Sequence, residues 1–341
     1  MKIWMAGVTS LVREKIVSDI LPQRLLSYYY LGAVENSCLK IMKYDVENDV
    51  DIFIDSGAFS ALAQGKEIKL DNYIKFIKEN EDDIDVYANL DVIGDAEATL
   101  ENQKEMQRAG LTPLPCFHFG EPIKFLHHYL DNYDYIALGG VASGSRKHTM
   151  SWLNDMFDKH ICDSDGEPKV KVHGFGITAL DWLLRFPWYS VDSSSWNVTA
   201  RVGNIYVPKV KNCHWVYNHI PDVIPVSTQS SSLSTKKHAT TLSPNRKKQM
   251  MEYLAQKGYI LGQSKFRTVS EGYKLKKKEA WADKKKAGKT LVEKKTIVGL
   301  ANDYKIRDGI NVEYFKDVQT FLSDHPRRFK AEHKRETFNL E

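Results

Sequence analysis

The sequence predicts an α/β protein built on a parallel (β/α)8 barrel of the TIM type, followed by a basic, mainly helical C-terminal extension. Two observations predict this fold class. Short apolar runs alternate about eight times with amphipathic helical segments over residues 1–234, and these runs are apolar at consecutive positions, as in strands buried on both faces. A doubly wound open sheet is the alternative, but no GxGxxG follows the first run and no GxxxxGKS or GxxxxGKT occurs.

Eight apolar runs are the expected strands. They occupy residues 2–8, 50–57, 86–92, 114–120, 135–142, 170–176, 189–194 and 204–210. Helical patterns separate them, at residues 71–80, 96–109, 122–133, 151–161 and 179–186. Gly110 is expected to end the second helix, Pro122 to begin the third and Pro187 to stop the last.

Length and composition allow one large core with an appendage, or two domains. The chain has 341 residues, of which 42% are hydrophobic. No run of about 18 apolar residues occurs, so we expect no membrane span, and the first residues do not resemble a signal peptide. Four cysteines without a CxxC pair favour a reduced, cytoplasmic protein.

Charge divides the chain unevenly. Residues 235–341 hold 26 Lys and Arg against 13 Asp and Glu, so the remainder is acidic. We expect a barrel at 1–226, a Ser/Thr-rich polar linker at 227–242 and a basic helical extension at 243–341, with helices beginning at Pro244, over 274–295 and over 312–322. A basic end favours a nucleic-acid partner, and a solvated helical tail is the alternative.

Acids, histidines and glycines lie at the ends of the predicted strands, at the face where parallel barrels carry their active sites. They are Asp55, Asp91, His118, Gly139, Gly140, His173 and Asp192. Acids at the ends of apolar strands cost free energy unless they are paired or used. Each aspartate taken alone could equally be a helix cap, so their conjunction carries the information.

The order of these strand ends resembles the tRNA-guanine transglycosylase superfamily. DSGAFS, NLD, ALGGVASG, HGFG and VDSSSW follow one another over roughly residues 7–207. The family has DSGGFQ, a strand-end Asp, IGGLAVGE, MGVG and a later strand-end Asp. DSGAFS, VDSSSW and the short barrel are more similar to the phage and bacterial branch that inserts 7-deazaguanines into DNA.

The resemblance implies roles for these residues. Asp192 aligns with the nucleophile that attacks the anomeric carbon, Asp55 with the general acid/base, and Asp91 with the acceptor of the guanine N–H groups. Phe59 aligns with the aromatic residue that stacks on the base. Further contacts with the base are expected from Ser56, Gly139, Gly140, His118 and His173. His118 stands where the tRNA enzymes have Gln, and His173 where they often have Met, so the roles of both stay open.

Base exchange by this route needs no redox or nucleotide cofactor, and we expect none. A carboxylate can hold the sugar covalently while bases exchange, and a second acid can move the proton. The DNA itself requires basic contacts. We expect them from Arg201, Lys276, Lys277, Lys278, Lys284 and Lys285.

The zinc subdomain of the tRNA enzymes, with its CxCxxC run, is missing from this sequence. Cys213, His214 and His219 are weak candidates for a zinc site, and we expect no metal. The missing subdomain weakens the case for tRNA and leaves the oligomeric state open.

The resemblance implies a pentosyltransferase, and the residues at the strand ends are compatible with that chemistry. The expected reaction exchanges guanine in DNA for a 7-deazaguanine base such as 7-cyano-7-deazaguanine. The alternatives are a tRNA-guanine transglycosylase, a non-catalytic nucleic-acid-binding barrel, and an unrelated barrel lyase or hydrolase with a small-molecule substrate.

Overall fold

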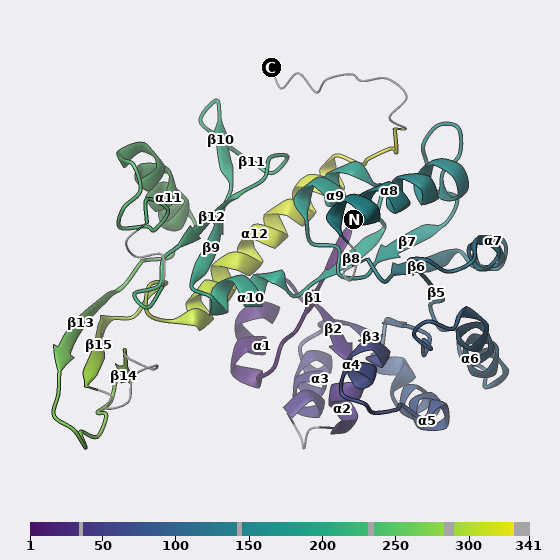
Figure 1. The fold of residues 1–341 in the computed structure, drawn as a ribbon, viewed down its shortest axis with the longest axis horizontal. Coiled ribbons are helices and arrows are strands. Elements are labelled where there is room, and N and C mark those ends of the chain that lie inside the picture. Colours follow the sequence, from purple (N-terminus) through teal and green to yellow (C-terminus); the bar gives the residue numbers. More distant parts are fainter. Residues whose placement is uncertain (34–36, 142–144, 231–234, 283–289, 331–341) are drawn as a thin grey trace. The chain divides into compact units, whose positions relative to one another are not determined.

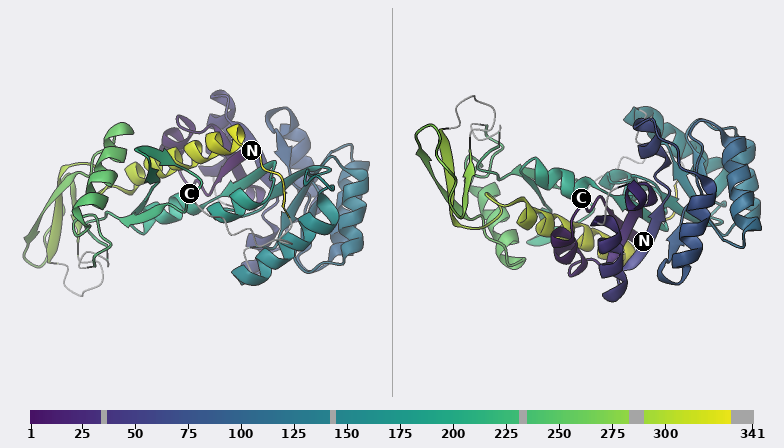
Figure 2. Two further views of the ribbon diagram at one scale, coloured as in Figure 1. Left: turned by 90° about the horizontal axis from the view of Figure 1, so that it is seen from above. Right: turned by 90° about the horizontal axis from the view of Figure 1, so that it is seen from below.

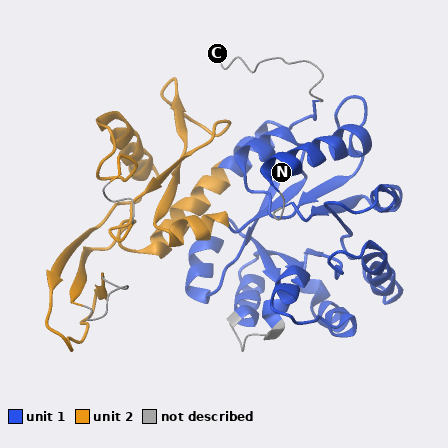
Figure 3. Ribbon diagram, viewed as in Figure 1, with its two compact units in different colours: residues 1–194, 318–341 blue, residues 195–317 orange. Residues whose placement is uncertain are grey.

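The computed structural model describes residues 1–33, 37–141, 145–230, 235–282 and 290–330. The chain forms two compact units (Figure 3): unit 1 is residues 1–194 with 318–341, and unit 2 is residues 195–317. This division differs from the one expected from composition, because residues 195–226 belong to unit 2 rather than to the barrel unit. The candidate site lies in unit 1.

Unit 1 is built on one eight-stranded sheet in which every pairing is parallel (Figure 1). The order across the sheet is β4-β3-β2-β1-β8-β7-β6-β5. The strands are β1 (Lys2–Ala6), β2 (Gln23–Ser27), β3 (Asp51–Asp55), β4 (Val86–Tyr87), β5 (Cys116–His118), β6 (Tyr135–Gly139), β7 (Lys171–Gly174) and β8 (Ser190–Ser193).

The sheet curls into a half-barrel. Among the described residues its outermost strands, β4 and β5, are joined by a single bridge between Ala88 and Leu114. At this bridge the Asn89 N–H donates to the Leu114 carbonyl at 2.9 Å, and the Leu114 N–H donates to the Tyr87 carbonyl at 2.8 Å. The predicted parallel α/β sheet is therefore confirmed, whereas a continuous ladder that closes the barrel is not found.

The sequence predicts eight strands, but not these eight. β2 was missed, because its sequence QRLLS carries a buried arginine, Arg24, in place of an apolar residue. The run at 204–210, expected as the eighth strand of the barrel, is instead β9 (Asn204–Val207), which pairs antiparallel with β12 (Asp222–Pro225) in unit 2.

Helices follow the strands and lie around the outside of the curled sheet (Figures 1 and 2). They are α1 (Leu11–Ser18), α2 (Tyr28–Ala33), α3 (Ser37–Glu47), α4 (Ala58–Ala63), α5 (Leu70–Asn80), α6 (Ala96–Arg108), α7 (Ile123–Asn132), α8 (Arg146–Met156) and α9 (Leu180–Arg185). Gly110 follows α6 with φ 87°, and Pro122 precedes α7, as the sequence predicted.

Side chains of the strands alternate between the interior of the sheet and the helices outside. An interior cluster draws on six strands and their ends; its buried members are Trp4, Ala6, Leu25, Phe53, Ala88, Leu114, Cys116 and Ala137. Ile3 and Met5, which alternate with Trp4 on β1, are also fully buried. Burial on both faces explains why these strands read as continuous apolar runs.

A buried ionic cluster joins α1, β2 and α3. Glu14, Arg24 and Asp45 have no exposed surface. The Arg24 Nε donates to Glu14 Oε1 at 2.7 Å. Burial and the charge of Glu14 raise the pKa of Asp45 to about 9, so its carboxyl group is protonated at neutral pH. Arg24 is thus the cation of this cluster, and Glu14 is its hydrogen-bonded partner.

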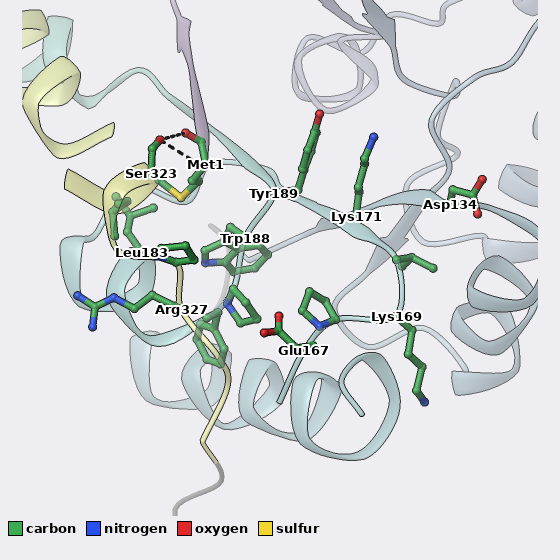
Figure 4. Close-up of a pocket in the computed structure, with 16 residues that line it drawn as sticks. Met1, Asp134, Glu167, Lys169, Lys171, Leu183, Trp188, Tyr189, Ser323 and Arg327 are labelled. Atoms are coloured by element: carbon green, nitrogen blue, oxygen red, sulfur yellow. Dashed lines mark hydrogen bonds between the residues drawn. The ribbon is translucent and has the colours of Figure 1, made fainter. Parts of the chain in front are cut away.

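A cavity of about 450 Å³ opens at the opposite ends of the strands from the candidate site (Figure 4). Met1, Lys171 and Tyr189, which line it, lie at or next to the first residues of β1, β7 and β8. In barrels of this kind, that face contributes to stability rather than to chemistry. We therefore place the candidate site at the other ends of the strands and not in this cavity.

Unit 2 contains strands as well as helices. Its elements are α10 (Ser195–Arg201), β9, β10 (Lys209–Lys211), β11 (His214–Val216), β12, α11 (Pro244–Gln256), β13 (Gln263–Thr268), β14 (Glu279–Trp281), β15 (Leu291–Ile297) and most of α12 (Tyr304–Asp324). The helix predicted over 274–295 was wrong: β14 and β15 lie there and pair antiparallel, with β13 on the other side of β15.

The expected linker at 227–242 is not simply solvated. Ala239 and Leu242 belong to a buried cluster with Ile205, Met250 and Ile310. The Thr228 hydroxyl donates to Glu293 on β15 at 2.8 Å. These described parts of the segment are therefore integral to unit 2.

None of the helices in the described part of the chain is both long and apolar enough to cross a membrane.

Candidate active site

The strand ends of unit 1 bring the predicted acids together. Asp55 ends β3, Asp192 lies in β8, and Asp91 follows β4. The charges of Asp91, Asp192 and His118 all act on the Asp55 carboxyl group. Residues spread over more than 130 positions of the sequence therefore share one electrostatic environment at the C-terminal ends of parallel strands.

Among the acids at the strand ends, Asp55 has a pKa well above its ordinary value. Burial, followed by the charge of Asp91, raises the pKa of Asp55 to about 7. Gly57 turns the chain from β3 into α4 at φ 77°, and a Cβ there would lie 2.3 Å from Ser27 Oγ. Gly57 of the DSG sequence is therefore required at the turn between β3 and α4, because a side chain there would collide with Ser27.

Asp192 is held in place by a backbone donor and a histidine. The Gly176 N–H donates to Asp192 Oδ1 at 2.6 Å, and His173 Nε2 lies 3.6 Å from the same oxygen. The other oxygen, Oδ2, has no hydrogen-bond partner among the described residues. This arrangement orients the carboxylate and leaves one oxygen available for chemistry.

His173 lies beneath Asp192 in apolar surroundings. It has no exposed surface, and its ring packs against Phe53 and Phe175 with centroids 4.8 and 4.5 Å away. Its Nδ1 lies 2.7 Å from the Ser190 hydroxyl. Burial lowers the pKa of His173, so the ring is neutral. These contacts favour a role in positioning Asp192 over the direct ligand contact predicted from the sequence.

His118 lies between two carboxylates. Its Nε2 is 3.2 Å from Asp91 Oδ2, and its Nδ1 is 3.3 Å from Glu121 Oε1. The backbone N–H of His118 also donates to Glu121 Oε2, at 2.9 Å. Cys116, two residues earlier on the same face of β5, places its Sγ 3.5 Å from Nε2. Burial raises the pKa of the Cys116 thiol to about 12.

Gly139 makes this close grouping possible. A Cβ at Gly139 would lie 2.7 Å from His118 Cδ2 and 2.8 Å from Cys116 Sγ. Gly140, the next residue, has φ 73°. The first glycine of the GG pair is thus required by the packing of His118 and Cys116 against β6, in addition to any contact with a ligand.

Two residues of the DSGAFS segment have contrasting surroundings. Phe59 is 68% exposed on α4, which is unusual for an isolated phenylalanine and suits a platform for a flat ligand. Ser56 is buried, and its Oγ accepts a hydrogen bond from the Ala58 N–H at 3.4 Å. The contacts between these residues and a base stay predictions.

The expected nucleic-acid contacts belong to unit 2. Arg201 ends α10 and is exposed. Lys276, Lys277 and Lys278 are exposed in the turn that precedes β14. Lys284 and Lys285 lie outside the described residues.

The weak zinc candidates do not form a ligand set in the described part of the chain. Cys213 and His214 are exposed, at the turn between β10 and β11. His219 is partly exposed, and its ring contacts Asn218. The group of potential ligands that does converge is Asp91, Cys116 and His118, whose ligand atoms lie within 4.8 Å of one another.

Sequence reasoning missed Cys116, Glu121 and Ser190, and it placed Gly176 at a strand end, in HGFG, without giving it a role. Cys116 was available from strand periodicity, because residues two apart on a strand share a face. Glu121 follows His118 by three positions, in a turn that no local pattern predicts. Gly176 and Ser190 act on residues far away in sequence, so only the fold reveals them.

Comparison with known proteins gives no family. No protein-family model matches the chain, and no curated protein sequence does. Among solved structures, an N-(5'-phosphoribosyl)anthranilate isomerase from Pyrococcus furiosus is similar over 57% of this chain and 88% of its own, with 14% identity and a TM-score of 0.33. A likeness this weak tells nothing about function.

Proposed function

We propose that unit 1 is a glycosyl-transferring barrel of the (β/α)8 type that exchanges guanine in DNA for a 7-deazaguanine base. The observation that carries the proposal is the pairing of two unlike acids at the strand ends. Asp192 is oriented by the Gly176 N–H with one oxygen unused, and Asp55 has a pKa of about 7. An oriented carboxylate can serve as nucleophile, and a carboxyl group that exchanges its proton near neutral pH can serve as acid/base.

In the first step of this reaction, Asp192 Oδ2 attacks C1′ of the nucleotide. The C1′–N9 bond breaks, and the departing guanine takes the proton of Asp55. In the second step, ionised Asp55 removes the N9 proton of the incoming base, whose N9 attacks C1′ and displaces Asp192. Atoms and charge balance over the cycle, which needs no oxidant or cofactor.

The other residues support recognition of a purine. Asp91 Oδ1 accepts no hydrogen bond in the described structure, and a carboxylate oxygen suits the N–H donors of the guanine edge. Phe59 offers an exposed aromatic face on which a base removed from its stack can lie. The resemblance to the DNA-modifying branch and the exposed lysines of unit 2 favour DNA as the substrate.

Base exchange tests the proposal directly. The full chain is incubated with duplex or single-stranded DNA and labelled guanine or 7-cyano-7-deazaguanine, and the DNA is then digested to nucleosides. We expect label in deoxyguanosine or its 7-deaza analogue. Label that enters tRNA but not DNA would assign the substrate to RNA. Tight binding with no label in either would identify a non-catalytic barrel.

The contribution of unit 2 to DNA binding is tested by removing positive charges from it rather than by truncating it. Leu300 and Ile310 share a buried cluster with Ile205, so removal of the residues after 241 would unfold the unit. Instead, Lys276, Lys277 and Lys278 are changed together to Ala. If they contact phosphates, DNA binding weakens and the slope of log K against log salt falls by about one for each lost contact.

A matched control changes exposed lysines of unit 1, Lys43, Lys75 and Lys78, and removes the same net charge. An equal loss of binding and of salt slope in both triple variants would mean that general charge, not the turn before β14, is responsible.

A further inference from the structure

The group formed by Asp91, Cys116 and His118 is built like a metal site. It joins a carboxylate oxygen, a sulfur and an imidazole nitrogen: Asp91 follows β4, and Cys116 and His118 are the first and last residues of β5. A tetrahedral zinc ion with bond lengths of about 2.0 Å to O and N and about 2.3 Å to S has an O–N edge of about 3.3 Å and an N–S edge of about 3.6 Å. The observed separations are 3.2 and 3.5 Å.

The surroundings of His118 are those expected of a histidine that binds a metal ion. A histidine that binds metal through one nitrogen usually donates its other N–H to a carboxylate, which fixes the ring. Nδ1 of His118 faces Glu121 Oε1 at 3.3 Å, and Glu121 is itself fixed by the backbone N–H of His118. Gly139 provides the close backbone packing that keeps Cys116 and His118 together.

A proton on His118 Nε2 explains this geometry less well than a metal ion does. If Nε2 carries a proton, it can be donated well to Asp91 or to Cys116, but not to both. One ion between the three atoms satisfies both neighbours of Nε2. The charge balance points the same way: among the described residues, neither Asp91 nor Glu121 has a lysine or arginine within ion-pair distance.

We propose that Asp91, Cys116 and His118 bind one divalent transition-metal ion, with Zn²⁺ the best match. Sulfur and imidazole ligands exclude Mg²⁺ and Ca²⁺, which prefer oxygen. Three protein ligands leave the fourth position of a tetrahedral ion for water or for a donor atom of the substrate, as in catalytic zinc sites. Asp91 binds through Oδ2, so that Oδ1 stays free for a base. The site does not depend on the proposed base exchange.

Metal binding by the full chain tests the site without any assay of activity. The purified protein is stripped with a chelator and titrated with Zn²⁺ against a chromophoric competitor. We expect one equivalent to bind. With Co²⁺, a sulfur-to-cobalt charge-transfer band and intense visible bands would report a tetrahedral site with one thiolate.

Variants assign the ligands. Cys116→Ser and His118→Gln should lose stoichiometric binding, and Cys116→Ser should lose the charge-transfer band. Cys162→Ser removes another buried cysteine and should keep both. Glu121→Gln should weaken binding about 10-fold to 100-fold, whereas Glu97→Gln, at an exposed carboxylate paired with Lys124, should not. Thermal melts confirm that each variant is folded.

Several outcomes would overturn the proposal. One is wild-type protein that binds no Zn²⁺ or Co²⁺ and shows no charge-transfer band. Another is Cys116→Ser that binds as tightly as the wild type. Binding that survives in Cys116→Ser but disappears in Cys213→Ser would move the ion to the exposed group in unit 2.

Discussion

Unit 1 contains two clusters of acidic side chains withdrawn from solvent, and they are built in opposite ways. In the first, Glu14 and Asp45 surround Arg24, and all three are fully buried. In the second, at the strand ends, Asp55, Asp91, Glu121 and Asp192 gather around histidines, and none of them pairs with a lysine or arginine in the described structure. The first cluster carries its own cation. The second has no lysine or arginine partner of its own in the described structure, as expected of a site that binds a ligand or reacts with one.

The largest expected effect is the loss of base exchange when Asp192, in the second cluster, is replaced. Asp192→Asn removes the nucleophile and should reduce base exchange by about 10⁴-fold or more, as for other residues that form the covalent intermediate. Wild-type protein should also form a denaturation-resistant adduct with the DNA, detected as a shifted band, and the variant should form none. An adduct formed by the Asp192→Asn variant would show that another residue attacks the sugar.

The second prediction concerns Asp55 and pH. Protonated Asp55 is needed when guanine leaves, so single-turnover adduct formation should fall as pH rises through about 7. Ionised Asp55 is needed when the new base enters, so adduct breakdown should fall as pH drops through the same value. Asp55→Asn should remove both pH dependences and slow exchange about 10²-fold to 10⁴-fold. Unaltered pH profiles in the variant would exclude Asp55 from proton transfer.

The third prediction addresses the first cluster. Arg24→Met leaves buried Glu14 without its cation and should lower the free energy of unfolding by about 3–5 kcal/mol, measured by urea denaturation. Arg108→Met, on the exposed face of α6 beside Glu101 and Glu105, should leave the unfolding midpoint nearly unchanged. Similar midpoints for both variants would mean that the buried arginine is not what stabilises α1 against β2.

The smallest effect should come from Asp45. Its pKa is about 9 in the folded protein and near 3.9 in an unfolded chain, so the unfolded state gains stability as pH rises between these values. Asp45→Asn abolishes that penalty. It should raise the free energy of unfolding at pH 8 and have little effect near pH 4. A variant that is less stable at pH 8 would show that Asp45 is ionised and paired.

Much of unit 1 could be predicted because most of its strands are apolar at consecutive positions. Seven of them lie within the predicted runs, and β3, β5, β7 and β8 carry Asp55, His118, His173 and Asp192 at or next to their last residues. β2 could not be found, because the pairing of Arg24 with Glu14 on α1 is invisible before the chain is folded. The same limit applies to Glu121, whose importance depends on the position that β5 gives His118.

The elements of unit 2 were harder to predict from the sequence than those of unit 1, for a physical reason. Lysine-rich sequence favours helix locally, yet β15 pairs on both sides with β13 and β14 and buries Val292 and Glu293. Non-local pairing thus overrides local preference. The hydrophobic repeat at 312–322 is strong enough to be unaffected, and it lies within α12.

The place of β1 in the sheet has a consequence for how the protein is made. β1 pairs with β2, which follows soon after it, and with β8, which is synthesised only after nearly all of unit 1. The Ile3 N–H also donates to Gln319, later still. Until then, one edge of an apolar strand is open to other chains, and contacts so distant in sequence form slowly. Newly made protein should therefore depend on chaperones or on low temperature to reach the native state in good yield.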